Sequence, residues 1–78
     1  MTLRERVAAV VGNGKRCGEV APDLDAVVAA QELVATVTGL ADQLYVADPD
    51  DGLARSVEPV LRAAVARVFA HPCRHKAA

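Results

Sequence analysis

The stretch AVVAAQELVATVTGLADQLYV, residues 26–46, decides the fold of this 78-residue chain. It contains no Pro and a single Gly, and its apolar residues recur at the three- and four-residue spacing of one helix face. That face consists of Ala30, Leu33, Val34, Val37, Leu40, Ala41 and Leu44. With Asp23 or Asp25 as its N-cap, the stretch predicts a helix over 25–46, in which the 21 residues 26–46 span about 31 Å.

The one glycine of this stretch, Gly39, lowers helix stability by about 1 kcal/mol relative to Ala. Two interpretations stay open: a neighbouring helix packs closely against Gly39, or the chain tolerates the loss. We favour close packing. An apolar face as broad as this one is also expected to touch more than one neighbouring helix.

A shorter helix is predicted over 3–12, on the N-terminal side. Thr2 and Glu5 have the spacing of a capping box, in which each side chain accepts a backbone N–H at the start of a helix. Apolar residues then follow at helical spacing: Leu3, Val7, Val10 and Val11. We expect the Gly-Asn-Gly sequence at 12–14 to end this helix, because these residue types readily adopt the left-handed conformation. Residues 15–22 then form a connector.

A third helix is predicted over 49–70, and it has the most regular helical pattern of the chain. Asp48 is a suitable N-cap, and the Pro that follows it suits the first helical position. The apolar face of this helix consists of Leu53, Val57, Val60, Leu61, Ala64, Val65 and Val68. Because Pro59 has no N–H to donate, we expect either a bend near Arg55 or a helix that begins at Ser56.

The whole chain is predicted to be all-α, because no segment has the pattern of a strand. Residues 1–78 form a single all-helical domain or a fragment of one, with a basic C-terminal tail at 71–78. Sixteen Ala, thirteen Val, seven Leu and no Ile or Trp give a core of small side chains. Such side chains bury little apolar area, so a chain this short is expected to need a partner surface.

The charge of the chain is nearly balanced, with 9 Lys and Arg against 10 Asp and Glu. Binding to nucleic acid draws on a marked excess of basic residues, so we expect no direct contact with nucleic acid. No apolar run approaches the roughly 20 residues that cross a bilayer, and the N-terminus lacks the apolar region of a secretion signal. We therefore expect a cytoplasmic protein without membrane association.

Three features follow one another in a recognisable order. The turn at 18–25 has the sequence GEVAPDLD, the long helix carries Gly-Leu-Ala at 39–41, and an acidic turn at 48–51 precedes a helix rich in Leu, Ala and Arg. Over residues 3–70 this order resembles the C-terminal regulatory domain of TetR/AcrR-family transcriptional regulators. The family's DNA-binding helix-turn-helix head would precede these segments. We expect either a fragment of a longer regulator or a separately encoded protein, and no DNA contact carries over to this chain.

The resemblance implies a non-catalytic segment for dimerisation and ligand sensing. In such regulators the last two helices form a hairpin that pairs with its copy into a dimeric four-helix bundle. The matching interface positions are Leu33, Val37, Leu40, Ala41, Leu44, Val57, Leu61, Ala64, Val65 and Val68. The small core favours the same homodimer, because the short first helix cannot cover both apolar faces. Two alternatives stay open: a compact three-helix monomer, and a stand-alone helical module that binds another protein as a modulator or antitoxin-like partner.

An effector pocket is a further implication of the resemblance. A small hydrophobic effector would need the missing upstream helices, so this chain could supply only part of the pocket wall. The candidate wall residues are Val7, Val10, Val27, Val34 and Tyr45. We favour the interpretation that they are ordinary core residues.

The cysteines and histidines are weak candidates for metal ligands. They are Cys17, His71, Cys73 and His75. Their H-x-C-x-H spacing differs from that of structural zinc sites, and cations after a helix C-terminus complement the helix dipole. We therefore expect no metal and no cofactor. Cys17 is either a reactive thiol activated by Lys15 and Arg16 or an inert one, and we favour the inert thiol.

No catalytic constellation can be assembled from the sequence. The sequence GNGK at 12–15 lacks the full phosphate-loop pattern and follows a predicted helix rather than a strand. Asp48, Asp50 and Asp51 lack the distal Glu of a calcium loop. Since no nucleophile, base and orienting acid can be grouped, we expect no enzyme activity.

Overall fold

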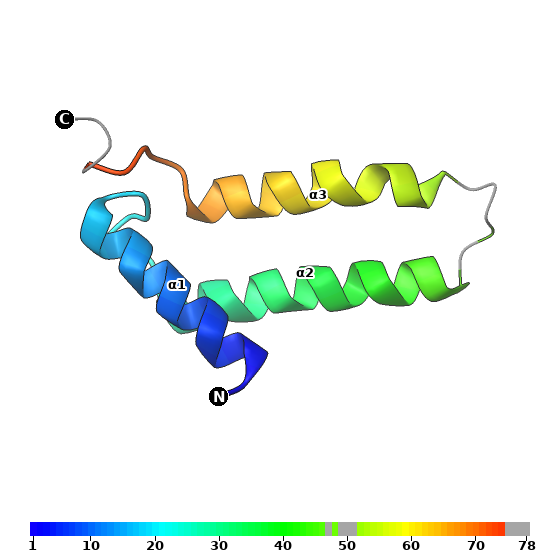
Figure 1. Ribbon diagram of the computed structural model, residues 1–78, viewed down its shortest axis with the longest axis horizontal. Helices are drawn as coiled ribbons and strands as arrows, with labels where there is room; N and C mark the ends of the chain where they lie inside the picture. Colours follow the sequence, from blue (N-terminus) through cyan, green and yellow to red (C-terminus); the bar gives the residue numbers. More distant parts are fainter. Residues whose placement is uncertain (47, 49–51, 75–78) are drawn as a thin grey trace.

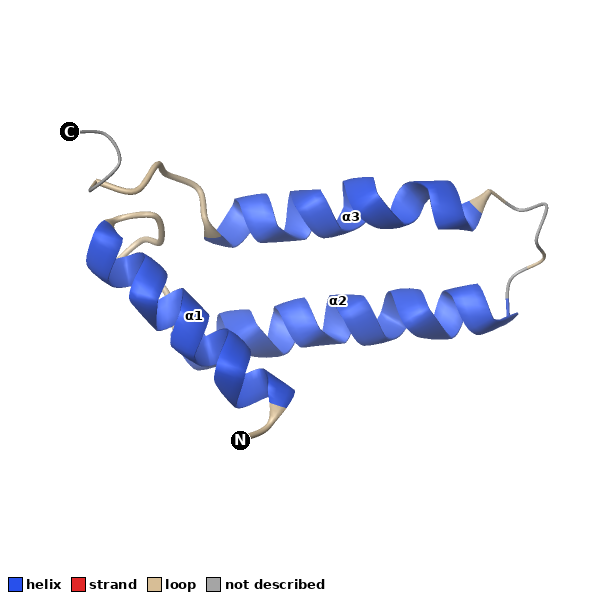
Figure 2. Cartoon of the chain, in the orientation of Figure 1, coloured by secondary structure: helices blue, strands red, loops and turns tan. Residues whose placement is uncertain are grey.

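The structure is a computed structural model, and it describes residues 1–46, 48 and 52–74. These residues contain three helices. They are α1 (Leu3–Cys17), α2 (Ala26–Val46) and α3 (Leu53–Val68). No strand occurs among these residues, so the predicted all-α class is confirmed for this part of the chain. In Figure 1 and Figure 2, α2 and α3 run in opposite directions, and α1 meets α2 near the N-terminal end of α2. None of the three helices is both long and apolar enough to cross a membrane.

The first helix begins as the capping box predicts, but it continues past its predicted end. Thr2 is extended (φ −76°, ψ 163°), and its Oγ1 accepts a hydrogen bond from the Glu5 N–H at 3.1 Å. The predicted stop at 12–14 is wrong, because these residues stay helical without a positive φ. The helix ends instead at Gly18, whose φ is +86° and whose N–H donates to the Lys15 carbonyl at 3.3 Å.

Gly14 has a packing role rather than a terminating one. A Cβ at Gly14 would lie 2.6 Å from Val20 Cγ2 and 2.8 Å from Phe69 Cε1, much closer than the optimal separation of carbon atoms. Gly39 differs, because an added Cβ there meets no described atom within 4 Å. The close packing that we favoured at Gly39 is therefore wrong within this chain, and the close approach occurs at Gly14.

The second helix matches its predicted range to within one residue. Of the two candidate caps, Asp25 is the one in place: its Oδ1 accepts hydrogen bonds from the Val27 N–H at 2.9 Å and the Val28 N–H at 3.2 Å. Satisfying the free N–H groups of the first turn fixes where a helix begins. The caps and the absence of Pro together explain why this element was predictable.

The third helix ends at Val68, two residues before its predicted end. It begins at Leu53, after Gly52 in the left-handed conformation (φ +77°), which has no side chain to cap the helix. The helix does not begin at Ser56, whose Oγ donates to the Leu53 carbonyl at 2.7 Å. Pro59 lies inside the helix, so the carbonyl four residues before it lacks its usual helical donor. The predicted first turn, 49–51, lies outside the described residues.

The core lies at the end of the molecule where all three helices and the loop after α1 come together. Its buried members are Val11, Val20, Ala29 and Val68, and Val7, Leu24, Ala26, Leu33 and Phe69 pack around them. Apart from Leu24, Leu33 and Phe69, these residues are Val or Ala, as the composition predicts. This end, which we call the packed end, is where the chain concentrates its buried apolar side chains.

The rest of the molecule leaves much of its surface uncovered. The accessible surface is 5693 Å². A folded monomer of this mass is expected to expose about 4,500 Å². The radius of gyration is 14.6 Å and the longest extent is 46 Å, whereas a compact domain of this length has a radius of gyration of about 11.5 Å. The chain therefore exposes about 1,200 Å² more than a compact monomer of its size.

Candidate functional site

One apolar stripe runs along α2, and only half of it is covered. Ala26, Ala30, Leu33, Val37, Ala41 and Leu44 recur at three or four residues and therefore share one helix face. The first three, which we call the covered half, are buried or half-buried near α1. The last three, which we call the open half, are exposed, and Val37 is 47% exposed. The chain's own packing therefore leaves these three residues uncovered, although Leu40, which belongs to the same predicted apolar face, is buried.

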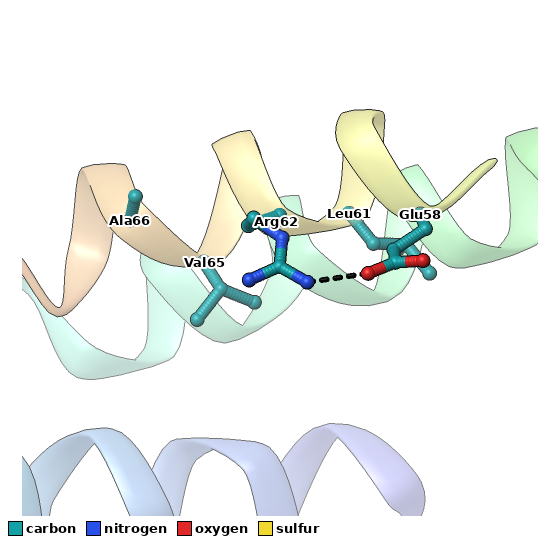
Figure 3. Close-up of a pocket in the computed structure, with 5 residues that line it drawn as sticks. All are labelled: Glu58, Leu61, Arg62, Val65 and Ala66. Carbon is teal, nitrogen blue, oxygen red and sulfur yellow. Dashed lines mark hydrogen bonds and ion pairs between the residues drawn. The ribbon is translucent and has the colours of Figure 1, made fainter. Parts of the chain in front are cut away.

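The outer side of α3 combines apolar residues with a charged pair. A groove of about 420 Å³ runs along this helix, lined by Glu58, Leu61, Arg62, Val65 and Ala66. Arg62 donates to Glu58 in an ion pair one helical turn apart, and both side chains are at least 75% exposed. Figure 3 shows both charged groups on the same side of α3 as Val65. The groove therefore has apolar residues beside two opposite charges.

The ten predicted interface positions differ in their surroundings. Those buried within the chain are Leu40, Ala64 and Val68. Those half-buried are Leu33, Val57 and Leu61. Those exposed are Val37, Ala41, Leu44 and Val65. The chain's own interior therefore uses the first group, and the last group remains accessible to a partner.

The five residues predicted for a pocket wall also differ in exposure. Val7 and Val34 are half-buried, whereas Val10, Val27 and Tyr45 are exposed, Tyr45 at 91%. None of them borders the α3 groove or a second hollow of about 440 Å³ that lies between α2 and α3. The effector pocket stays a prediction, and the favoured interpretation as core residues is wrong for Val10, Val27 and Tyr45.

The described part of the C-terminal tail lies against the C-terminal end of α1. The Arg74 backbone N–H donates to the Cys17 carbonyl at 2.7 Å, and its guanidinium donates to the Arg16 carbonyl at 2.8 Å. The His71 N–H donates to the Glu19 carbonyl at 3.2 Å. The last carbonyls of a helix have no intrahelical donor, so the tail supplies one. The basic tail was expected to complement the dipole at the end of the third helix, but Arg74 donates hydrogen bonds to the last carbonyls of α1.

Two of the four candidate metal ligands, Cys17 and Cys73, lie beside Glu19. Their sulfur atoms and a Glu19 carboxylate oxygen all lie within 4.8 Å of one another. The Cys17 thiol donates a hydrogen bond to Glu19 Oε1 at 3.3 Å. The exposed residue His71 is not part of this group, and His75 lies outside the described residues. Glu19 cannot be recognised as a ligand from the sequence, because the sequence does not show that the tail returns to α1.

The Cys17 thiol has a raised pKa. The pKa lies above the usual value of 9.0, first because of the hydrogen bond with the Cys73 side chain. Burial and the Glu19 side chain also raise the pKa, while the backbone of Glu19 lowers it. A thiol with a raised pKa is protonated near neutral pH and is a weak nucleophile. This direction favours the inert thiol over one activated by Lys15 and Arg16.

Comparison of the chain with protein-family models, with curated proteins and with solved structures gives no match. The resemblance to TetR/AcrR-family regulators therefore rests on the motifs quoted above and on the order of the segments.

Proposed function

We propose that this chain is a non-catalytic dimerisation and regulatory segment, similar to the C-terminal part of TetR-like transcriptional regulators. The observation that carries the proposal is the apolar stripe of α2, whose covered half is packed and whose open half is exposed. In the proposed dimer, α2 and α3 act as a hairpin and pair with their copies in a four-helix bundle. The dimer would bury the open half of the stripe together with the outer side of α3.

The exposed area supports a partner of considerable size. The chain exposes about 1,200 Å² more than a compact monomer of its mass. A stable interface typically takes about 800 Å² from each partner. If the chain buried one interface of ordinary size, its accessible surface area would therefore fall close to that of a compact fold.

The charges support a second copy of the chain as that partner. In a two-fold interface the same surface meets itself, so it must be complementary to itself. Glu58 and Arg62 place opposite charges at the α3 groove, and each can face its counterpart in the copy. The formal net charge of −1 also keeps the repulsion between two copies small.

The regulatory part of the proposal rests on the resemblance. In TetR-like regulators an effector binds within this domain, and helix movement reaches the DNA-binding heads. This chain would supply the dimer and part of the wall around a small hydrophobic effector. The coding DNA upstream of Met1 tests this part. An in-frame helix-turn-helix supports it, whereas a stop codon and a ribosome site directly before Met1 favour a stand-alone interaction module.

Sedimentation equilibrium tests the dimer with a matched pair of variants. Val65→Asp places a charge on the proposed interface, and Val10→Asp places the same charge on α1, where Val10 is 55% exposed. We expect a wild-type dimer, about 30-fold or more weaker association of Val65→Asp, and unchanged association of Val10→Asp. Val65 is 45% exposed, so each copy loses about 1 kcal/mol of valine burial. Because the substitution is present in both copies, the dimer loses about 2 kcal/mol, which is worth about 30-fold in affinity.

Three results would contradict the dimer. They are a monomeric wild type, equal weakening by both variants, and a wild type that binds only a different protein. Circular dichroism of both variants shows whether each remains helical, so that a loss of association is not confused with a loss of fold.

A further inference from the structure

Three metal-ligating side chains meet at the C-terminal end of α1. Cys17 is the last residue of the helix, Glu19 follows the Gly18 turn, and Cys73 comes from the tail. One ligand atom from each lies within 4.8 Å of the others, and all three residues are half-buried. Both cysteines of the chain therefore belong to one group, although they lie far apart in the sequence.

We infer that Cys17, Glu19 and Cys73 bind a divalent ion of the zinc class. Thiolate sulfur and carboxylate oxygen are both ligands of zinc, at about 2.3 Å and about 2.0–2.2 Å from the ion. Two sulfur ligands of a tetrahedral ion lie about 3.8 Å apart. Because the three ligand atoms lie within 4.8 Å of one another, no pair would need to close by more than about 1 Å. The fourth position would hold water or an external ligand.

The backbone around the cluster already fixes the positions of its ligands. The left-handed conformation of Gly18 (φ +86°) reverses the chain between Cys17 and Glu19, which turns Glu19 back toward the thiol. The tail is attached on both sides of Cys73, by the His71 N–H to the Glu19 carbonyl and by the Arg74 N–H to the Cys17 carbonyl. Such outer contacts orient the ligands of a metal site.

Positively charged side chains near the cluster can balance the negative charge that remains when a divalent ion is bound. Binding of the ion would release the protons of both thiols to solvent. Two thiolates and one carboxylate then carry three negative charges, so a divalent ion leaves one negative charge uncompensated. The Arg74 side chain crosses Gly18, with its Nε 2.9 Å from where a Cβ of Gly18 would lie. Arg16 and Lys15 lie in the last turn of α1. These cations can balance the remaining charge.

The cluster is independent of the proposed dimer. It shares no residue with the open half of the α2 stripe or with the α3 groove. A bound ion would fasten the tail to the end of α1 and would stabilise the packed end. Metal binding and dimerisation can therefore succeed or fail separately.

Titration of the reduced chain with Zn²⁺ tests the site. We expect one ion per chain and a higher melting temperature in the presence of zinc. With Co²⁺ as a probe, we expect a sulfur-to-metal charge-transfer absorption band. Cys17→Ser, Cys73→Ser and Glu19→Gln each remove a direct ligand, so each should weaken binding by at least the roughly 10–100-fold that is lost with an outer-shell partner, and the two cysteine variants should weaken it most. The control His71→Ala/His75→Ala should bind zinc as tightly as the wild type.

The opposite pattern would overturn the inference. Zinc binding that survives Cys17→Ser and Glu19→Gln but disappears in His71→Ala/His75→Ala would assign the ion to the tail histidines. A wild type that binds no zinc, or whose cobalt complex lacks the sulfur band, would also contradict the site. If either serine variant loses its helical circular dichroism, the cobalt band of the wild type and the Glu19→Gln titration decide the outcome.

Discussion

The two halves of the α2 stripe contain similar residues in opposite surroundings. In the covered half, Ala30 is fully buried and Leu33 packs against the core. In the open half, Val37 and Leu44 stay exposed although the helix is continuous. The difference lies in what covers α2, because α1 is only 15 residues, about 22 Å, long and meets α2 near one end. A chain of this length completes one packed end and leaves apolar surface at the other.

The largest effect is expected for a core valine of the packed end. Val11 is fully buried, whereas its neighbour Val10 is 55% exposed on the same helix. Val11→Ala should lower the free energy of unfolding by about 2 kcal/mol, because it removes buried apolar area and leaves a cavity. Val10→Ala should change it by less than about 0.5 kcal/mol. Urea denaturation of both variants measures the difference, and equal effects would mean that the packed end is not the source of stability.

Two glycines test the same contrast, because the change from Gly to Ala is expected to lower stability at Gly14 and to raise it at Gly39. Gly14→Ala should destabilise by about 1 kcal/mol, because overpacking against Val20 and Phe69 outweighs the gain in helix propensity. Gly39→Ala should stabilise by up to about 1 kcal/mol, because its added methyl has open space. Thermal denaturation followed by circular dichroism measures both changes. Stabilisation by Gly14→Ala would show that the loop and tail do not pack against α1.

The smallest effect is expected at the exposed ion pair of α3. Arg62→Gln removes the contact with Glu58, whose side chain is also at least 75% exposed. Exposed pairs at this spacing contribute about 0.3–0.5 kcal/mol, and salt screens them. At a protein concentration low enough to keep the chain monomeric, urea denaturation at low and high salt should show a loss of this size that shrinks with salt. A loss above about 1 kcal/mol would indicate that α3 depends on its outer surface for stability.

Local sequence signals were sufficient for much of the fold. The three helices and the near-exact range of α2 follow from apolar spacing, from the Asp25 cap and from the absence of Pro in α2. The Thr2 cap of α1 follows in the same way. These features depend on neighbours within one helical turn, so the sequence contains the information needed to predict them.

Features that depend on distant residues could not be predicted. Whether a glycine ends a helix depends on its φ, which is positive at Gly18 but not at Gly14. The residues that approach Gly14, Val20 and Phe69, come from outside α1. The thiol cluster depends on the tail returning to α1, which brings Cys73 to Cys17. A local pattern at 71–75 could suggest only the histidines beside Cys73. The missed ligand Glu19 becomes visible only in three dimensions.

The most direct test of the central claim is amide hydrogen exchange along α2 at two protein concentrations. Exchange protection reports which backbone amides are held by packed structure. If a second copy covers the open half, protection of residues 37–46 rises with protein concentration, while protection of residues 26–33 stays the same. Protection that is equal in both halves and independent of concentration would contradict the claim.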